Sequence, residues 1–304
     1  ITPPPPPTST LRTTRRQRQM CIRDSPQTAR VFVNRVWLHL FGEGIVRTPE
    51  DFGVYGERPT HPELLDYLAV RFVDEGWSVK KLIRQIMLSR VYQLSCDDQA
   101  AALQTDPGNE LLWRMNQRRL EAEAIRDAIL LVGGQLDLTP PAGSPVQQLG
   151  EGIIGRNVNT AQLGRQHRSR SVYLPIVRGA VPEILGLFDF PEPSIVGGAR
   201  DVTTVPTQAL FMMNSSLVID NARKLAERLA EQCADHAGRV DLAYRIALSR
   251  PAEATEVDRA VQFITETQAA LQQSDQQKPA EAAMTAWTAF CQSILASAEF
   301  RYIN

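Results

Sequence analysis

Three acidic side chains flank one loop and the helix that is expected to follow it. Asp51 and Glu57 lie in the loop over residues 43–59, and Glu63 comes directly after Pro62 at the start of the next helix. A pair of carboxylates on opposite sides of a glycosidic bond is what glycoside hydrolysis requires. The sequence does not give the separation of these carboxylates, so a carbohydrate-active site is a hypothesis.

His61 lies among these carboxylates and could act as a general base if one of them oriented its ring. The simpler interpretation is a histidine in the first turn of a helix that does no chemistry. The chain has three other histidines, which are His39, His167 and His236. The four histidines are scattered, and no two of them stand at metal-ligand spacing from each other, so we predict no metal site.

A ladder of charges marks a third candidate. Arg119, Glu123 and Asp127 recur every four residues, and Arg126 lies three after Glu123, so a helix over residues 117–132 would align them. Such ladders are usually solvated ion pairs worth roughly a few tenths of a kcal/mol each. If they are buried, they instead hold loops in place at a desolvation cost. We favour a structural role over a catalytic one.

Two further polar clusters could bind an anion. In the first, guanidinium, hydroxyl and amide side chains gather where Pro206 opens a helix with free N–H groups: Arg200, Thr203, Thr204 and Gln208. In the second, three arginines surround a histidine: Arg165, His167, Arg168 and Arg170. The alternatives are a hydrogen-bonded turn for the first cluster and a solvated loop for the second, and we favour both alternatives.

The composition is that of a globular protein. Of 304 residues, 43% are apolar and 22% charged, which excludes disorder of the whole chain. There are 33 basic and 34 acidic residues, so no overall positive field favours nucleic acid, and no apolar run is long enough to span a membrane. The sequence contains no G-x-S-x-G, P-loop or dinucleotide fingerprint. We therefore expect neither a nucleic-acid partner nor a membrane-spanning segment.

Residues 1–25 differ from the rest of the chain. They combine five consecutive prolines, Pro3–Pro7, with threonines and arginines, and they have almost no apolar side chains. No apolar stretch of the kind found in signal peptides follows the arginines. The segment over residues 16–25 resembles translated sequencing-adapter sequence, so we interpret residues 1–25 as a disordered or artefactual segment; a linker is the alternative.

The elements that must position these side chains are mostly helices. A wide apolar face and Gly42 predict a helix from Pro26 to Phe41. Thr60 and Glu63 fit a capping box for the next helix, and Ser78 fits an N-cap for the one after. Further helices are expected over residues 117–132, 182–188, 206–213, 215–229, 240–248, 257–271 and 280–298.

Outside the helices, we expect a long surface loop over about 135–169 and an edge strand at Val172–Pro175. The predicted fold is mainly α, an irregular helical domain with long loops and at most a small strand pair. We predict one domain over 26–304, in which the N-terminal helices share a core with the helix over 117–132 and with the C-terminal helices.

Four cysteines without a C-x-x-C pair exclude a zinc ribbon and a disulfide-dense scaffold. Outside residues 1–25 the cysteines are Cys96, Cys233 and Cys291. We interpret these three as buried small hydrophobic side chains, and their disulfide status is left open.

Six strings, in this order, resemble the C-terminal domain of large planctomycete surface proteins, which is a domain of unknown function. They are ARVFVNRVW (29–37), DFGVYGERPTHPELLD (51–66), GWSVK (76–80), RLEAEAIRD (119–127), RSVYLP (170–175) and DVTTVPTQAL (201–210). The resemblance covers about residue 26 to the C-terminus. Longer members of the family carry an N-terminal cytochrome-c-like domain with a haem-binding C-x-x-C-H motif, which is absent here. The resemblance therefore implies export to the periplasm or cell surface, and haem only in an upstream domain that this fragment lacks.

Two functions remain open. The first is a non-catalytic structural or interaction module of an exported multidomain protein, with its upstream domains or a cell-surface protein as partner and no cofactor of its own. The second is an enzyme that acts on carbohydrate or in a haem-linked redox system. The second would require a charged pocket built from the candidate residues Asp51, Glu57, His61, Arg119, Glu123, Arg126 and Arg200.

Overall fold

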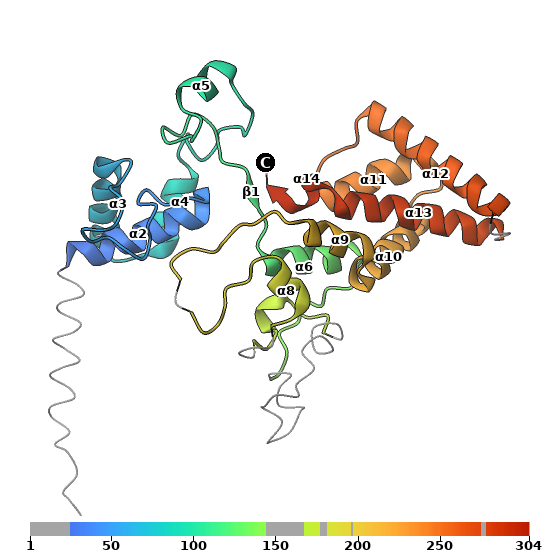
Figure 1. Cartoon of the computed structure of the whole chain (residues 1–304), viewed down its shortest axis with the longest axis horizontal. Helices are drawn as coiled ribbons and strands as arrows, with labels where there is room; N and C mark the ends of the chain where they lie inside the picture. Colours follow the sequence, from blue (N-terminus) through green and yellow to red (C-terminus); the bar gives the residue numbers. More distant parts are fainter. Residues whose placement is uncertain (1–24, 144–166, 177–180, 196, 275–277, 304) are drawn as a thin grey trace, which may run out of the picture. The chain divides into compact units, whose positions relative to one another are not determined.

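The computed structural model describes residues 25–143, 167–176, 181–195, 197–274 and 278–303 (Figure 1). Within these residues the chain is mainly helical, and the only sheet is a pair of two-residue strands, β1 (Arg118–Arg119) and β2 (Tyr302–Ile303). The predicted fold class is confirmed. Residues 1–24 of the predicted artefactual segment and residues 144–166 of the predicted long loop lie outside the described residues.

The chain divides into two compact units at the bond between Arg118 and Arg119. We call the residues up to Arg118 unit 1 and Arg119–Ile303 unit 2. Each unit has its own cluster of buried apolar side chains. The expected common core is wrong, because helix α6 (Ala122–Val132) buries its apolar face among the C-terminal helices, whereas the N-terminal helices bury theirs among themselves. The extent of a single domain over 26–304 stays a prediction.

Unit 1 is built from helices α2 (Pro26–Phe41), α3 (Pro62–Asp74), α4 (Val79–Met87) and the short α5 (Ala100–Thr105). Helix α2 has its predicted bounds, because Gly42 adopts a left-handed φ of 87° and donates its N–H to the Leu38 carbonyl. Helix α2 packs against α3, and α4 contacts both. The core between them is formed mainly by Val33, Trp37, Phe41, Leu65, Leu68, Phe72, Leu82 and Ile86.

A buried amide ties the loop after α2 to that helix. Asn34 is fully buried; its Nδ2 donates to the Val46 carbonyl (2.9 Å), and its Oδ1 accepts from the Val46 N–H (2.8 Å). Gly44 allows this close approach, since a Cβ there would lie 2.8 Å from Asn34 Nδ2. A single side chain therefore pairs with the loop backbone much as a neighbouring strand would.

The predicted capping box at the start of α3 is wrong. His61 occupies the N-cap position without a side-chain cap, and the Thr60 hydroxyl donates instead to the Ile45 carbonyl, 3.3 Å away. The Thr60 N–H donates to the same carbonyl at 2.9 Å, so Thr60 fastens the preceding loop. The cap predicted for α4 is present, since Ser78 Oγ accepts from the Lys81 N–H at 3.5 Å.

Unit 2 is a larger helical assembly in which α10 and α12 pack along α13 and α6 packs against α8 and α10 (Figure 1). Its core is formed by residues such as Ile125, Ile129, Leu185, Leu225 and Ile264. Besides α6, its elements are the 3-10 turn η2 (Ser171–Tyr173), α8 (Glu183–Leu187), α9 (Pro206–Asn214), α10 (Ser216–Gln232), α11 (His236–Leu248), α12 (Ala254–Ser274), α13 (Pro279–Ala296) and α14 (Ala298–Arg301).

Two predicted elements of unit 2 differ most from the structure, and the ends of its other predicted helices lie within four residues of the observed ones. The helix predicted from residue 117 begins only at Ala122, because the preceding backbone is extended and the Leu120 N–H donates to the Arg301 carbonyl (2.7 Å). The strand predicted at Val172–Pro175 is instead the turn η2, since the Ser171 N–H donates to the Asp127 carboxylate at 2.8 Å and not to a sheet partner.

The three cysteines in the described residues are free. Cys291 lies in the core of unit 2, and burial raises the pKa of its thiol. Cys96 and Cys233 are only half-buried, so the interpretation as core side chains is confirmed for Cys291 alone.

Candidate functional site

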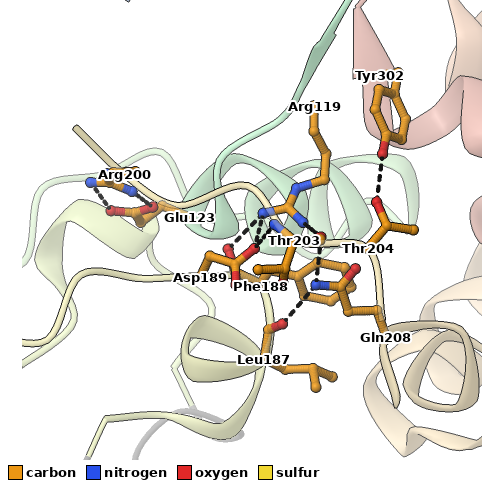
Figure 2. Close-up of polar contacts among 10 residues, drawn as sticks. All are labelled: Arg119, Glu123, Leu187, Phe188, Asp189, Arg200, Thr203, Thr204, Gln208 and Tyr302. Atoms are coloured by element: carbon orange, nitrogen blue, oxygen red, sulfur yellow. Dashed lines mark hydrogen bonds and ion pairs between the residues drawn. The ribbon is translucent and has the colours of Figure 1, made fainter. Parts of the chain in front are cut away.

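The guanidinium of Arg119 lies at the centre of a polar cluster in unit 2 (Figure 2). Strand β1 positions this residue, and its side chain is only 3% exposed. Its Nη2 donates to Asp189 Oδ2 (2.6 Å) and to the Phe188 carbonyl (3.2 Å), and its Nη1 donates to the Thr203 carbonyl. One buried cation thereby joins the end of α8 to the segment that precedes α9.

Asp189 accepts hydrogen bonds from both sides of this junction. Its φ of 62° turns the chain after α8, and its carboxylate accepts from Arg119, from the Thr203 N–H (2.8 Å) and from Thr203 Oγ1 (2.8 Å). Burial raises the pKa of this carboxyl, but the hydrogen bonds from Thr203 and Arg119 outweigh burial, and the pKa lies below its usual value. The group is therefore held in its ionised form.

Gln208 completes the cluster from the first turn of α9. Its side chain is buried, and Nε2 donates to the carbonyls of Leu187 (3.0 Å) and Thr203 (3.2 Å). At the edge of the cluster, the hydroxyls of Thr204 and Tyr302 lie 3.4 Å apart. Figure 2 draws this contact beside the Arg119 side chain. We call Arg119, Asp189, Thr203 and Gln208 the Arg119 network.

A second ion pair holds the start of the same segment. Arg200 forms a bidentate pair with Glu123 on α6, with N–O distances of 2.6 and 2.9 Å. The hydrogen bond with Glu123 raises the pKa of Arg200, and its guanidinium lies 5.5 Å from the centroid of the Phe190 ring. The two side chains are 31% and 24% exposed, so this pair lies at the surface of unit 2.

Arg126, also on α6, holds the segment before η2 and is 1% exposed. Its Nη1 donates to Ser171 Oγ (3.1 Å) and the Ser169 carbonyl (3.1 Å), and its Nη2 donates to the His167 carbonyl. Asp127 lies 3.3 Å from Arg126 Nη1 and accepts from Ser171 Oγ at 2.6 Å. Burial lowers the pKa of Arg126, because removal from water disfavours the charged form.

The charge ladder predicted from the sequence is not a solvated face. Arg119 lies on β1 and not on the helix, and Arg119, Glu123 and Asp127 do not pair with one another. Arg119 and Glu123 both reach the segment between α8 and α9, and Asp127 reaches the segment at η2. The alternative that the sequence left open, charges that hold loops, describes them, with Arg119 buried and Glu123 24% exposed. Arg119 was wrongly placed on the helix because it lies in β1, and local spacing cannot reveal the pairing of that strand with β2.

The remaining candidates lie in unit 1. Asp51 Oδ1 accepts from the Gly53 N–H (2.7 Å), and Thr48 Oγ1 donates to the Asp51 carbonyl (2.8 Å), so Asp51 builds a turn. Glu57 is exposed, and its N–H donates to Thr48 Oγ1. Nδ1 of His61 lies 3.0 Å from the Thr60 hydroxyl. A pocket shared by all seven candidates therefore stays a prediction.

The basic cluster around His167 is described only in part, since Arg165 lies outside the described residues. In the described residues, no group of three His, Cys, Asp or Glu side chains is arranged to hold a metal ion. In those same residues, no helix combines the length and hydrophobicity that a membrane span requires.

Comparison of the sequence with models of known protein families shows to which family the chain belongs. The model of the family described as PSD1, a protein of unknown function (DUF1553), matches residues 17–264, which is more than half of the chain. The chain belongs to the PSD1 family. No curated protein and no solved structure matches it significantly.

The PSD1 match contains every string that carried the resemblance, together with the Arg119 network and the Arg200–Glu123 pair. The prediction of a domain of unknown function is confirmed. The match also begins nine residues before Pro26, inside the segment interpreted as artefactual. Planctomycete origin and association with cytochrome c stay predictions.

Sequence reasoning missed two parts of the PSD1 structure. One is Asp189, which lies in a loop without any motif of its own. The other is Arg250, whose guanidinium pairs with Glu256 (2.8 Å) and with Glu299 (2.5 Å), so that it joins the turn before α12 to α14. Pro251 and an acidic first turn were the available signals for the Glu256 pair, whereas nothing local indicates Glu299.

The Arg250 cluster gives a prediction for acid pH. The hydrogen bond with Arg250 lowers the pKa of Glu256 from 4.5 to about 2. Because folding lowers this pKa, the stabilisation is complete above pH 4.5 and is lost as the pH falls towards about 2. We expect Glu256→Gln to lower Tm at neutral pH, and we expect the difference from the wild type to shrink over that window.

The measurement is thermal unfolding followed by circular dichroism between pH 7 and 2, with Glu253→Gln as the control on the same turn. Glu253 uses its backbone N–H in this cluster (to Glu256, 2.8 Å), so its side-chain substitution should leave Tm nearly unchanged. A Glu256→Gln deficit of the same size at all pH values would contradict the prediction.

Proposed function

We propose that this PSD1 chain is a non-catalytic structural or interaction module of an exported multidomain protein. The observation that carries the proposal is the use made of the charged candidates in unit 2. Arg119, Arg126 and Arg200 direct their donors to carboxylates and backbone carbonyls of the same unit, where they fasten connecting segments.

The chemistry of these groups also supports this role. An acid–base catalyst needs access to its substrate and a pKa close to the working pH. Arg119 and Arg126 are 3% and 1% exposed, and the pKa of Asp189 is shifted below its usual value and so further from neutrality. Each of these properties favours a role in holding chain segments together over a role in proton transfer.

Exposed apolar side chains support an interaction role. The turn that Asp51 builds carries Val54 and Tyr55, which are each 97% exposed. Two adjacent large apolar side chains held in water on a hydrogen-bonded turn offer apolar area that a partner protein could bury. The proposed partners are the upstream domains of the same protein or a protein of the cell surface, and any haem would belong to an upstream domain.

The structural role of the Arg200–Glu123 pair can be tested by exchanging its charges. We expect Arg200→Glu and Glu123→Arg to lower the free energy of unfolding by about 1 kcal/mol each, since each single variant places like charges side by side at a partly exposed site. The double variant restores an ion pair and should recover a good part of that loss. Urea unfolding of the four proteins gives the coupling energy directly.

Two results would contradict the proposed function. Single variants as stable as the wild type would show that the Arg200–Glu123 pair does not stabilise the segment before α9. Turnover of a carbohydrate or redox substrate by the purified chain, abolished by one of these substitutions, would show an enzyme. The proposed export can be checked separately by fractionating cells that express the native gene, where recovery in the cytoplasm alone would refute it.

A further inference from the structure

Helix α4 presents a cationic face outwards from unit 1. Successive residues of a helix are rotated by about 100° around its axis. All the exposed long side chains of α4 after Val79 therefore lie within one arc of roughly 120°. These are Lys80, Lys81, Arg84, Met87 and, at the C-cap, Leu88. Leu82 and Ile86 lie on the opposite side and are buried in the core of unit 1. We call the five outward side chains the α4 face.

The charge of this face is not balanced within the surrounding sequence. Residues 76–96 contain no aspartate or glutamate, in a chain whose net charge is −1. In the part of the chain that the structure describes, none of the ion pairs involves Lys80, Lys81 or Arg84. Within the described residues, these three cations thus have no internal structural task of the kind that Arg119 and Arg126 perform.

Apolar surface adjoins the charge. Met87 and Leu88 are 41% and 63% exposed, and they lie one turn beyond Arg84 on the same side of the helix. A ligand that covers the whole face must thus bring negative charge to one end and apolar surface to the other. A charge run that serves only to keep the surface solvated would need the cations but not the adjoining apolar side chains.

We propose that the α4 face binds an acidic segment of a partner protein, with carboxylates over Lys80, Lys81 and Arg84 followed by an apolar side chain over Met87 and Leu88. The inference rests on the proposed interaction role and names the chemistry of the partner. Charge complementarity supplies steering and specificity, and the apolar end supplies buried area.

The order of charge along the α4 face favours a short segment over an extended polyanion. The cations occupy the first turns of the helix, and the apolar side chains of Met87 and Leu88 follow them. A flat anionic membrane or a nucleic-acid duplex carries negative charge across its whole surface. A peptide can confine its carboxylates to one helical turn and place an apolar side chain after them, as the α4 face requires.

The test uses the full chain and a short fluorescein-labelled peptide in which glutamates are followed by leucines, read by fluorescence anisotropy. The comparison peptide has glutamine in place of each glutamate. In the charge-reversal variant, Lys80→Glu is combined with Arg84→Glu. The matched control combines Arg223→Glu with Lys224→Glu on α10, which changes the net charge equally at exposed positions.

We expect the acidic peptide to bind the wild type and to lose affinity at least about tenfold with the α4 reversal but less than about twofold with the control. The affinity of the wild type for the acidic peptide should fall with added salt. Leu88→Ser should also lower this affinity, because it removes apolar surface from the α4 face. If circular dichroism shows that the reversal unfolds the chain, Lys80→Gln combined with Arg84→Gln replaces it.

Three outcomes would overturn the inference. The wild type could fail to bind the acidic peptide, or both reversals could weaken binding equally. Alternatively, phosphatidylglycerol vesicles or a DNA duplex could bind more tightly than the peptide through Lys80 and Arg84, which would assign the face to a membrane or to nucleic acid. None of these results bears on the exchange of Arg200 and Glu123, so the proposed function is tested independently.

Discussion

Replacement of Arg126 by alanine is expected to lower the free energy of unfolding of the chain by about 3–4 kcal/mol, the loss typical of removing one member from a buried ion network. The guanidinium is 1% exposed and donates to three residues of the segment before and within η2. Without it, the carbonyls of His167 and Ser169 lose a charged donor inside the protein.

Urea unfolding followed by circular dichroism measures this effect. Arg170→Ala is the matched control, because it removes an exposed arginine from the same segment and should cost less than about 0.5 kcal/mol. Arg126→Lys keeps the charge but lacks the planar fork that reaches several acceptors, so it should recover only part of the loss. An unfolding midpoint unchanged by Arg126→Ala would show that this arginine is merely solvated.

The second large effect is expected at Asp189, where we predict a loss of about 3 kcal/mol for Asp189→Ala at neutral pH. Alanine removes the acceptor for Arg119 and Thr203 and must also adopt a φ of 62°, which disfavours it by about 1 kcal/mol. Asp189→Asn tolerates that backbone conformation and should lose only the part that depends on charge, about 2 kcal/mol.

The pH dependence identifies the charge as the cause. Folding lowers the pKa of Asp189 below its usual 3.8, so the stabilisation is complete above that value and is lost as the pH falls below it. The difference in unfolding free energy between the wild type and Asp189→Asn should therefore be constant near neutrality and shrink in acid. Asp201→Asn, at an exposed position nearby, serves as the control.

A double-mutant cycle with Arg119→Met separates the pair from the rest of the network. The coupling energy between Arg119 and Asp189 should exceed 1 kcal/mol, since the two are 3% and 14% exposed and lie 2.6 Å apart. Additive losses, or a deficit of Asp189→Asn that is the same at every pH, would contradict the network as described.

Local signals predicted the helices well and their partners poorly. Pro26 and Gly42 bound α2 because both act within one turn of the chain. The capping-box pattern at Thr60 failed because a carbonyl 15 residues away took the hydroxyl instead. Helix α6 was placed too early because the extended backbone of Arg119 depends on pairing with β2, which local propensity does not register.

The candidate site shows the same division. Charged residues on and before α6, and Arg200 before α9, were identified from their type and spacing. Arg119, Glu123, Arg126 and Arg200 all make specific contacts. Their partners were not predictable, because Asp189 and Ser171 become neighbours of these residues only after the loops fold back onto α6. Residue type indicated which side chains form ion pairs and hydrogen bonds, whereas the fold determines the partner of each.

The hydrogen bond from the Leu120 N–H to the Arg301 carbonyl joins positions about 180 residues apart. During synthesis on the ribosome, this bond can form only after nearly all of unit 2 has been translated, whereas the contacts of unit 1 close over much shorter stretches. Pairing between distant positions slows folding. Unit 1 should therefore acquire protection from hydrogen exchange first, with β1 and the Arg119 network among the last parts of the molecule to become protected.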